Sequence, residues 1–440
     1  MTARATKGTS KLTRETFSIS RETEFFTEKE LEMQIGHGRQ WWPVALLKEL
    51  LDNSLDACES AEVPPEVEIE VADDGFSVAD NGPGIPEEVI ARSLDFMQRV
   101  SDKALYVSPT RGQLGNALKT VWAAPYVANG SGRVEVETGG RRHLIEVSLD
   151  EIAQRPQVSH TVEDDGLVRN GTRVRVWWPD SGCSQDDDED RVSYNTPPDP
   201  QELVEGYAAL NPHATFRLST LTYQATDRDS YKWRASDPTS PHWYTPETLQ
   251  SLIAGYLLRE REGGRARTVR EFVSEFRGLS STAKQKQATE GLSRAHLRDL
   301  VEGGALDTDV IQKLLHRMQA LSKPVKPQAL GVIGESHLKS WMVRYANVAA
   351  ESVKYARRFG VDDGLPFVIE LAFGVREGDE DGRRVLYGLN WAPALSTPVP
   401  ELSTLMAQMR MDPHDPITVV LHMAKPRFDF VDHGKSRLEL

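Results

Sequence analysis

The sequence predicts an α+β protein in which a mixed, mostly antiparallel sheet carries helices on one face. Leucines recur at helical spacing in 46–55, which predicts a helix over 42–60 with a core-facing stripe. Val and Ile alternate with acidic residues in 67–80, a pattern typical of two short strands joined by a turn at 73–75. The pattern turns helical again between 243 and 321, and a second α/β region follows.

The remaining elements follow in chain order. A helix is expected after Pro86, because two glutamates occupy its first turn. A second helix is predicted at 117–124, and three strand-like segments then complete the first sheet: "GRVEVETGG", "RRHLIEVSLD" and "GTRVRVWWPD". Prolines in 322–331 mark a boundary. Beyond it we expect an amphipathic helix at 335–358 and strands in "PFVIELAFGV", "RVLYGLNWAP" and "ITVVLHMA".

Composition indicates a soluble globular protein, which we expect in the reducing cytoplasm. Its 440 residues suit two to four domains. No run of about 18 apolar residues predicts a membrane span, and the N-terminus has no apolar signal segment. Cys58 and Cys183 are too few for a disulfide framework, and no Cys/His cluster has zinc-site spacing. The net charge of −14 argues against a surface that coats nucleic acid, although a local basic face such as 259–270 could bind it.

Polar residues appear where a helix and a strand would not need them. Glu49 and Asn53 lie four residues apart, so one surface of the first helix presents a carboxylate beside an amide. Asp80 ends a strand before the tight turn "NGPGIP". Its carboxylate can accept a hydrogen bond from an exocyclic amine, while the glycines let a flat ring approach the backbone.

A third motif is the segment "RGQLGNALK" at 111–119, which places two glycines before a helix. Free N–H groups at a helix N-terminus bind anions, and Lys119 adds positive charge nearby. Each motif alone also has an ordinary explanation. Asn-Gly-Pro-Gly is a common hairpin turn, glycine-rich turns often precede helices, and Thr172 is a β-branched residue in a strand.

Taken in order, the motifs resemble the Bergerat nucleotide-binding fold of the gyrase, Hsp90, histidine kinase and MutL (GHKL) ATPase superfamily. The series is Glu-x-x-x-Asn on a helix, Asp-x-Gly-x-Gly after the next strand, Gly-x-x-Gly before a later helix, and Gly-Thr in a strand. The resemblance implies ATP and Mg²⁺ as ligands. Glu49 would then be the general base that polarises the attacking water, and Asn53 would ligate Mg²⁺.

The same resemblance implies the rest of the nucleotide site. Asp80 would recognise the adenine amino group with Thr172 beside it, and Gly82 and Gly84 would form the base pocket. The residues expected around the phosphates are Gly112, Gln113, Leu114, Gly115, Asn116, Ala117 and Lys119. Asp52 has no clear role in this scheme, and Asp56 is expected to face solvent or to cap neighbouring backbone groups.

Further segments resemble the B subunit of type IIB topoisomerases, the topoisomerase VI B family. They include "SISRETEFF", "LNPHATFRL", "ARTVREFVSEF", "ALGVIGESHL" and "VLYGLNWAPAL". This likeness implies an N-terminal arm, an ATP-binding domain, a helix–two-turn–helix domain and a transducer domain, at 1–35, 36–242, 243–322 and 323–440. The family's transducer lends a lysine to the γ-phosphate. "FVDHGKSRLEL" predicts Lys435 for that part, with Lys425 as the second candidate.

The resemblance also implies partners. ATP would drive homodimerisation, with an arm that uses Phe25 and Phe26 as exposed anchors on the other protomer, and the dimer would act on duplex DNA with a separate topoisomerase VI A-like cleavage subunit. Two departures weaken this reading. Ala117 replaces a third glycine, and the family's long stalk helix and a DNA-cleaving tyrosine domain are missing after Lys435. The alternative is a stand-alone ATPase or nucleotide switch that regulates a protein partner.

Overall fold

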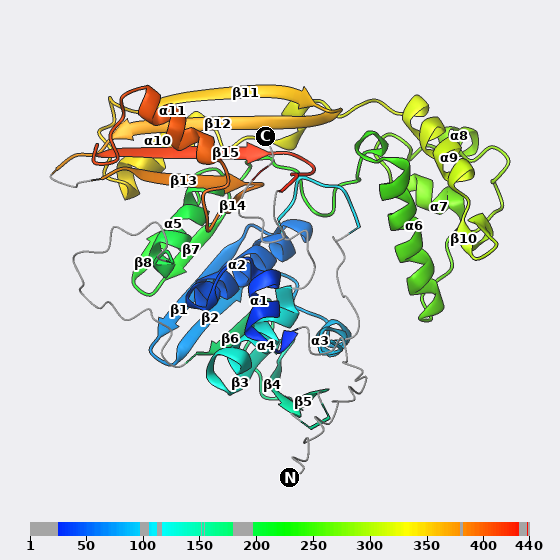
Figure 1. Cartoon of the computed structure of the whole chain (residues 1–440), viewed down its shortest axis with the longest axis horizontal. Helices are drawn as coiled ribbons and strands as arrows, with labels where there is room; N and C mark the ends of the chain where they lie inside the picture. The colour runs from blue at the N-terminus through cyan, green and yellow to red at the C-terminus, as the bar shows by residue number, and fades with distance from the viewer. Residues whose placement is uncertain are drawn as a thin grey trace, which may run out of the picture.

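Two large β-sheets and a set of short helices make up the protein (Figure 1). The computed structural model describes residues 25–96, 105–111, 117–150, 152–153, 155–178, 197–378, 382–430 and 438. The first sheet has the strand order β5-β4-β3-β6-β2-β1-β7-β8, and its pairs are antiparallel except for β1 with β7. Its strands are β1 (Glu66–Ala72), β2 (Gly75–Asp80), β3 (Gly132–Thr138), β4 (Arg141–Asp150), β5 (Arg155–Glu163), β6 (Thr172–Trp177), β7 (Thr215–Leu218) and β8 (Leu221–Tyr223).

Helices cover one face of this sheet, because every second residue along its strands is apolar. Val134 and Val136 on β3 are buried on that face. Helices α2 and α4 pack against the strands and α1 packs on α4, as Figure 1 shows. The helices of this layer are α1 (Glu28–Ile35), α2 (Trp42–Ser60), α3 (Glu87–Ser93) and α4 (Ala117–Asn129).

Helix α5 (Pro200–Leu210) joins the first sheet to the second. Residues 203–210 are all buried, because α5 contacts β7 on one side and β13 and β14 on the other. Gly206 permits this close approach, since a Cβ there would lie 3.1 Å from a methyl group of Leu386. The second sheet has the strand order β11-β12-β15-β13-β14. Its strands are β11 (Lys354–Asp362), β12 (Leu365–Val375), β13 (Arg384–Leu389), β14 (Ala392–Pro393) and β15 (Ile417–Ala424). The helices in this part of the chain are α10 (Glu335–Tyr345) and α11 (Pro400–Gln408).

A group of short helices lies between the two sheets in the sequence and to one side of them in Figure 1. Thr245 and Thr268 close capping boxes at the starts of α6 and α7, which explains why two short helices begin where they do. The group consists of α6 (Pro246–Arg261), α7 (Val269–Ser274), α8 (Thr282–Ala288), β9 (Val301–Glu302), β10 (Ala305–Leu306) and α9 (Thr308–Leu321). Short 3₁₀ turns are η2 (Arg39–Trp41), η3 (Pro241–Trp243), η4 (Leu297–Leu300) and η5 (Pro327–Leu330).

The predicted α+β class is confirmed, and so are the helix at 42–60 and the hairpin that ends at Asp80. The predicted helix over 335–358 is wrong in its second half. Helix α10 ends at Tyr345, and residues 354–362 form the edge strand β11. Asn347 adopts a left-handed φ of 49°, which is incompatible with a continuing helix. The sequence interpretation also missed β5 and α11.

The expected exposure of Phe25 and Phe26 is wrong as well. Each side chain is 6% exposed. Their rings pack on Phe96, with centroid distances of 5.6 Å and 4.9 Å. Thr27 then caps α1, whose Leu31 is fully buried. Burying the two rings within their own chain removes the cost of apolar exposure that suggested docking on a second protomer.

Candidate functional site

Helix α2 presents two polar faces beside its apolar stripe. Glu49 and Asn53 lie one helical turn apart and are both half-buried. The next residue, Ser54, hydrogen-bonds the carboxylate of Asp80 at the end of β2. The structure therefore brings the Glu49–Asn53 face of α2 close in the fold to the strand end that carries Asp80.

Asp80 is held by its own turn. Its Oδ1 accepts a hydrogen bond from the Gly82 N–H at 2.8 Å, and Thr172 on β6 is its register partner. Burial raises the pKa of the Asp80 carboxyl, while the hydrogen bonds from Gly82, Ser54 and the Thr172 backbone oppose that rise. The structure thus places Asp80 and Thr172 side by side, at the mouth of the turn.

Glycines keep this carboxylate accessible. A Cβ on Gly82 would lie 3.0 Å from Asp80 Oδ1, and a Cβ on Gly84 would lie 2.6 Å from Thr138 Oγ1. Gly171 has a φ of +88°, and a Cβ there would collide with the Asp80 carbonyl. A carboxylate beside a backbone without side chains is a suitable acceptor for the amino group of a flat base.

Lys119 lies near the start of α4 and is almost fully buried. Its ammonium donates to the carbonyl of Asp95 and lies 5.9 Å and 5.8 Å from the ring centroids of Phe25 and Phe96. Burial lowers the pKa of Lys119 to about 8. Lys119 therefore contacts Asp95 and the rings of Phe96 and Phe25.

The other predicted phosphate residues cannot be placed. Gly112, Gln113, Leu114, Gly115, Asn116 and Lys435 lie outside the described residues, and so does the side chain of Ala117 at the start of α4. Lys425, the second candidate for the γ-phosphate, pairs with Asp362 of β11 at 2.7 Å. Among the residues that the structure describes, no group of three or more His, Cys, Asp or Glu side chains is arranged to hold a metal ion.

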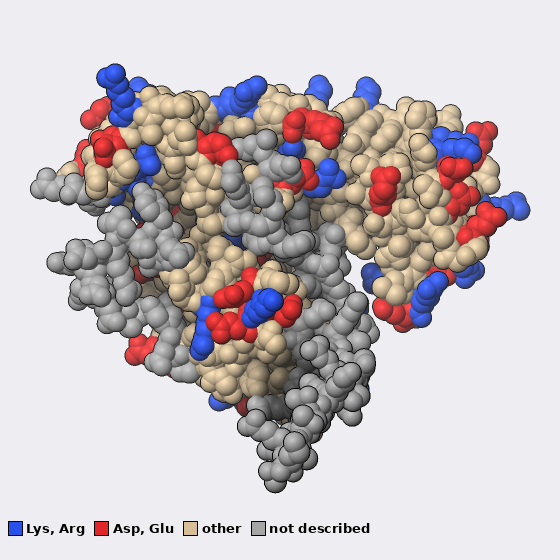
Figure 2. All heavy atoms as spheres, viewed as in Figure 1, with Lys and Arg blue, Asp and Glu red and all other residues tan. Residues whose placement is uncertain are grey.

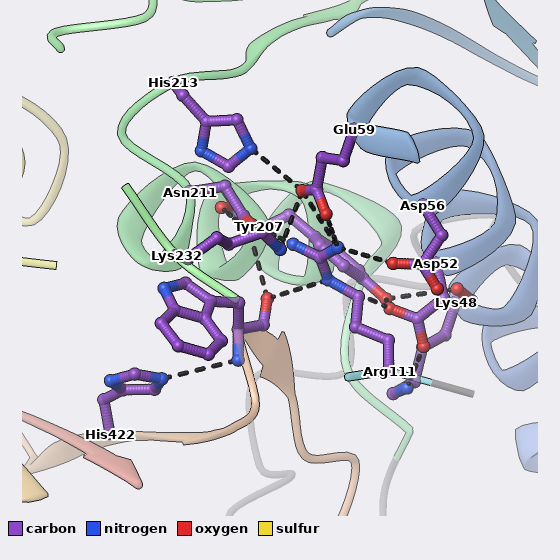
Figure 3. A network of polar contacts seen from close by, with 11 residues as sticks. Lys48, Asp52, Asp56, Glu59, Arg111, Tyr207, Asn211, His213, Lys232 and His422 are labelled. Carbon is purple, nitrogen blue, oxygen red and sulfur yellow. Dashed lines mark hydrogen bonds and ion pairs between the residues drawn. The ribbon is translucent and has the colours of Figure 1, made fainter. Parts of the chain in front are cut away.

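A buried polar network fills the space behind α2 (Figure 3). Its centre is the Arg111 guanidinium, whose Nη1 lies 2.9 Å from Asp56 and 3.0 Å from Glu59. Asp52 pairs with Lys48 at 2.7 Å and accepts a hydrogen bond from the Tyr207 hydroxyl at 2.6 Å. Asp56 therefore does not face solvent, contrary to the sequence expectation. It is 6% exposed and is neutralised by Arg111.

Glu59 contacts two further polar residues of this network, Lys232 and His213. Lys232 Nζ lies 2.7 Å away and His213 Nε2 lies 2.9 Å away. Burial alone would raise the pKa of Glu59, but Arg111 and Lys232 lower it well below its usual value. Burial lowers the pKa of His213, although the nearby Glu59 carboxylate opposes that shift. Burial, with Arg111 nearby, also lowers the pKa of Lys232 to about 8.

Sequence reasoning missed Arg111 although it starts the glycine motif. A signal was present, because Asp52, Asp56 and Glu59 form an acidic row on one side of an otherwise apolar helix. Buried carboxylates at helical spacing require a cation. Nothing in the local sequence identified Lys232 as a second such cation, because it lies in a separate loop.

Comparison with known proteins now adds to the geometry. Residues 39–181 match the family model described as "Histidine kinase-, DNA gyrase B-, and HSP90-like ATPase". The chain carries a GHKL ATPase domain. This match includes α2, the Asp80 turn and Thr172. No helix within the described part of the chain is long and apolar enough to cross a membrane.

The chain is also a distant relative of the topoisomerase VI B proteins. It is 23% identical over 426 residues to the B subunit of type 2 DNA topoisomerase 6 from Archaeoglobus fulgidus, covering 89% of this chain and 66% of that protein. The Methanosarcina acetivorans protein of the same name is 25% identical over 377 residues, covering 80% of this chain and 56% of the relative. This chain therefore spans less than two thirds of the length of either protein. The solved ATPase region of Saccharomyces cerevisiae topoisomerase II is similar at a TM-score of 0.39 with 10% identity, covering 90% of this chain and 76% of that one.

Proposed function

We propose that this chain binds and hydrolyses ATP through its GHKL domain. The observation that carries the proposal is the Asp80 carboxylate, fixed by the Gly82 N–H, opposite Thr172 and joined to α2 through Ser54. Asp80 accepts the adenine amino group, and the site continues along α2 toward Asn53 and Glu49. This order is the one that the family motif requires.

Glu49 and Asn53 have different roles in the proposed hydrolysis. Glu49 takes a proton from the attacking water, and Asn53, one turn further along α2, would hold Mg²⁺ through its amide oxygen. When bound, Mg²⁺ offsets the charge that develops on the phosphates. Because both side chains lie on one helix, the base and the metal ligand keep a fixed separation, and the placement of α2 decides whether the base reaches the water.

The test of nucleotide recognition is Asp80→Asn, with Asp74→Asn as a matched control. Both aspartates belong to the β1–β2 hairpin, but Asp74 lies in its exposed turn and pairs with Arg175. A ligand at 100 times its Kd stabilises a protein by about 2.7 kcal/mol. We expect a non-hydrolysable ATP analogue to raise the Tm of the wild type and of Asp74→Asn, and to have little effect on Asp80→Asn. Equal protection of all three proteins would exclude Asp80 as the adenine acceptor.

We further propose that the ATPase works as a dimeric, ATP-gated clamp of the topoisomerase VI B type, on duplex DNA and with a separate cleavage subunit. The relatives named as B subunits of topoisomerase VI support this. The order of four parts at 1–35, 36–242, 243–322 and 323–440 belongs to the same proposal. Capture of a cleavage-type subunit from the native host, dependent on a non-hydrolysable ATP analogue, is the result expected. Analogue-dependent capture of a different partner, with no DNA binding, would favour a nucleotide switch.

The basic stretch at 259–270 lends little support to the DNA part of this proposal. Arg265 pairs with Glu271 and Arg267 pairs with Glu275. Figure 2 shows Lys/Arg and Asp/Glu atoms interspersed over the helices α6–α9 on this face. Paired charges attract phosphates less than the sequence alone suggests, so a DNA surface on this chain has to be sought by measurement.

A further inference from the structure

One arginine connects the ATPase helix to the second sheet. The Arg111 Nη1 bonds Asp56 and Glu59 of α2, while its Nε bonds the carbonyl of Trp391 at 3.4 Å. Asn211 bonds the same carbonyl at 3.0 Å and also accepts from Arg111. Figure 3 shows the Arg111 guanidinium beside the carboxylates of Asp56 and Glu59. The side chain of Arg111 has no exposed surface.

The turn that carries Trp391 is an unusual one. Asn390 and Trp391 join β13 to β14 and have φ values of 48° and 64°. Both values are left-handed, and glycine ordinarily fills the second position of such a two-residue turn. The Asn390 N–H bonds the Met423 carbonyl at 2.9 Å, and the Trp391 N–H bonds His422 Nε2 at 3.4 Å. The second sheet therefore fixes the direction of the Trp391 carbonyl.

Besides its backbone carbonyl, the indole ring of Trp391 also contacts the buried polar network around Arg111. Lys232 Nζ lies 5.2 Å from the indole centroid and pairs with Glu59. The network balances three carboxylates against three cations, namely Asp52, Asp56 and Glu59 against Lys48, Arg111 and Lys232. A buried and balanced network tolerates little displacement of any member, because an unpaired charge at such a place is costly.

We propose that Arg111 and Trp391 are positioning residues for ATP hydrolysis, which together make the placement of Glu49 and Asn53 depend on the second sheet. This inference rests on the proposed function. Asn53 follows Asp52 directly, and Glu49 follows Lys48. Any movement of the Lys48–Asp52 pair therefore also moves the side of α2 that carries Glu49 and Asn53. The adenine side rests on β2 and β6 through Asp80 and its turn, and it reaches α2 through the Ser54 hydrogen bond rather than through the network. Loss of either contact, that of Arg111 with the Trp391 carbonyl or that of Lys232 with the Trp391 ring, should therefore change turnover more than nucleotide affinity.

The test is Trp391→Gly, measured by steady-state ATPase kinetics. Glycine suits the left-handed turn and keeps a carbonyl there, while it removes the ring from Lys232. Small misplacements of reacting groups lower rates by up to about 100-fold, so we expect kcat to fall about tenfold with KM for ATP within about twofold of the wild type. Trp391→Phe, which keeps a ring, should recover most of kcat. Arg111→Lys should reproduce the loss without altering the turn.

The matched control is Arg384→Lys. Arg384 on β13 pairs with Glu205 of α5 at 2.7 Å, so it joins the same two sheets without contacting α2. Its kcat should stay within about twofold of wild type, since its contact does not place the catalytic face. An equal loss in Arg384→Lys would overturn the proposal, because it would indicate general loosening of the junction. Unchanged kcat in both Trp391→Gly and Arg111→Lys would also overturn it.

Hydrogen exchange separates failure of this inference from failure of the proposed function. Without nucleotide, the amides of residues 50–59 in α2 should exchange faster in Trp391→Gly and Arg111→Lys than in wild type or Arg384→Lys. If the wild type has no ATPase activity, the proposed function fails, and this exchange pattern still decides whether the second sheet holds α2. Equal exchange in all four proteins would overturn the positioning role.

Discussion

Glu59 shows how neighbouring cations can keep a buried carboxylate ionised. It is 5% exposed and lies within 3.0 Å of Arg111, His213 and Lys232. Removing one partner from a buried ion pair costs about 3–5 kcal/mol, since the other charge is left unpaired. These residues therefore help to hold the ATPase domain and the loops behind it together.

Glu49 gives the residue-scale prediction for catalysis. Glu49→Gln keeps the size of the side chain and removes the base, so we expect kcat for ATP hydrolysis to fall by about 10²–10⁴-fold with nucleotide binding retained. The measurement is phosphate release at saturating ATP, with analogue binding followed separately. Glu88→Gln, at an exposed position of α3, is the matched control. Turnover near the wild-type rate would remove Glu49 from its role.

At the scale of elements, local patterns predicted what is locally determined. Helix α2 and the β1–β2 hairpin were predicted with correct positions, because the leucine stripe and the strand alternation are complete within each segment. Strand β11 was missed because its identity depends on pairing with β12. A signal was available in the Asp363–Gly364 turn, whose residues have φ values of 44° and 76° and belong to the Asp-Gly hairpin type.

The candidate site also combines motifs that are local in the sequence with a contact between distant residues. Glu49 with Asn53 and Asp80 with its turn could be predicted, because each motif is short and belongs to a known family order. The Arg111–Trp391 contact joins residues 280 positions apart, and no local periodicity encodes such a pairing. Trp391 itself reads as a strand residue in sequence, whereas its function in the fold comes from the direction of its backbone carbonyl.

Strands β12 and β15 carry a buried acid whose effect depends on pH. Glu370 accepts hydrogen bonds from His422 Nδ1 at 3.0 Å, from the Ile333 and Gly334 N–H groups at 2.9 Å each and from the Tyr355 hydroxyl at 2.7 Å. Burial alone would raise the pKa of Glu370, but these hydrogen bonds and the nearby His422 lower it to about 2. A lowered carboxyl pKa stabilises the fold above the unfolded value of 4.5, and this contribution is lost as pH falls from 4.5 towards 2.

We therefore predict that Glu370→Gln is less stable than wild type at pH 7, by about 3 kcal/mol from this ionisation. The difference should shrink as pH falls from 4.5 towards 2, because the unfolded chain takes up the proton below pH 4.5 while the folded wild type keeps Glu370 ionised until about pH 2. Urea unfolding at pH 7, 4 and 3 measures it. Glu351→Gln, at an exposed position, should match wild type throughout. A difference that stays constant from pH 7 to pH 3 would contradict the assignment.

At the scale of the whole molecule, the two sheets share one helix and one network. Helix α5 is buried between them, and Asn211 directly after it bonds the Trp391 carbonyl. The Arg384–Glu205 pair adds a second polar connection from β13 to α5. A displacement of α2 can therefore reach the second sheet through packed and charged contacts.

The last prediction concerns nucleotide-dependent dimerisation, which the likeness to topoisomerase VI B suggests. We expect a non-hydrolysable ATP analogue to convert monomer into dimer in sedimentation velocity, because closed and open states differ in affinity for intact nucleotide. Glu49→Gln with ATP itself should behave in the same way.

The role of the N-terminal arm is tested best by deleting residues 1–24, because a longer deletion would remove Phe25 and Phe26 from the core. The shortened chain should keep the wild-type Tm without nucleotide and dimerise more weakly with the analogue. Wild type that stays monomeric at micromolar concentration with the analogue bound would contradict the clamp, and a shortened chain that dimerises as well as wild type would contradict the arm.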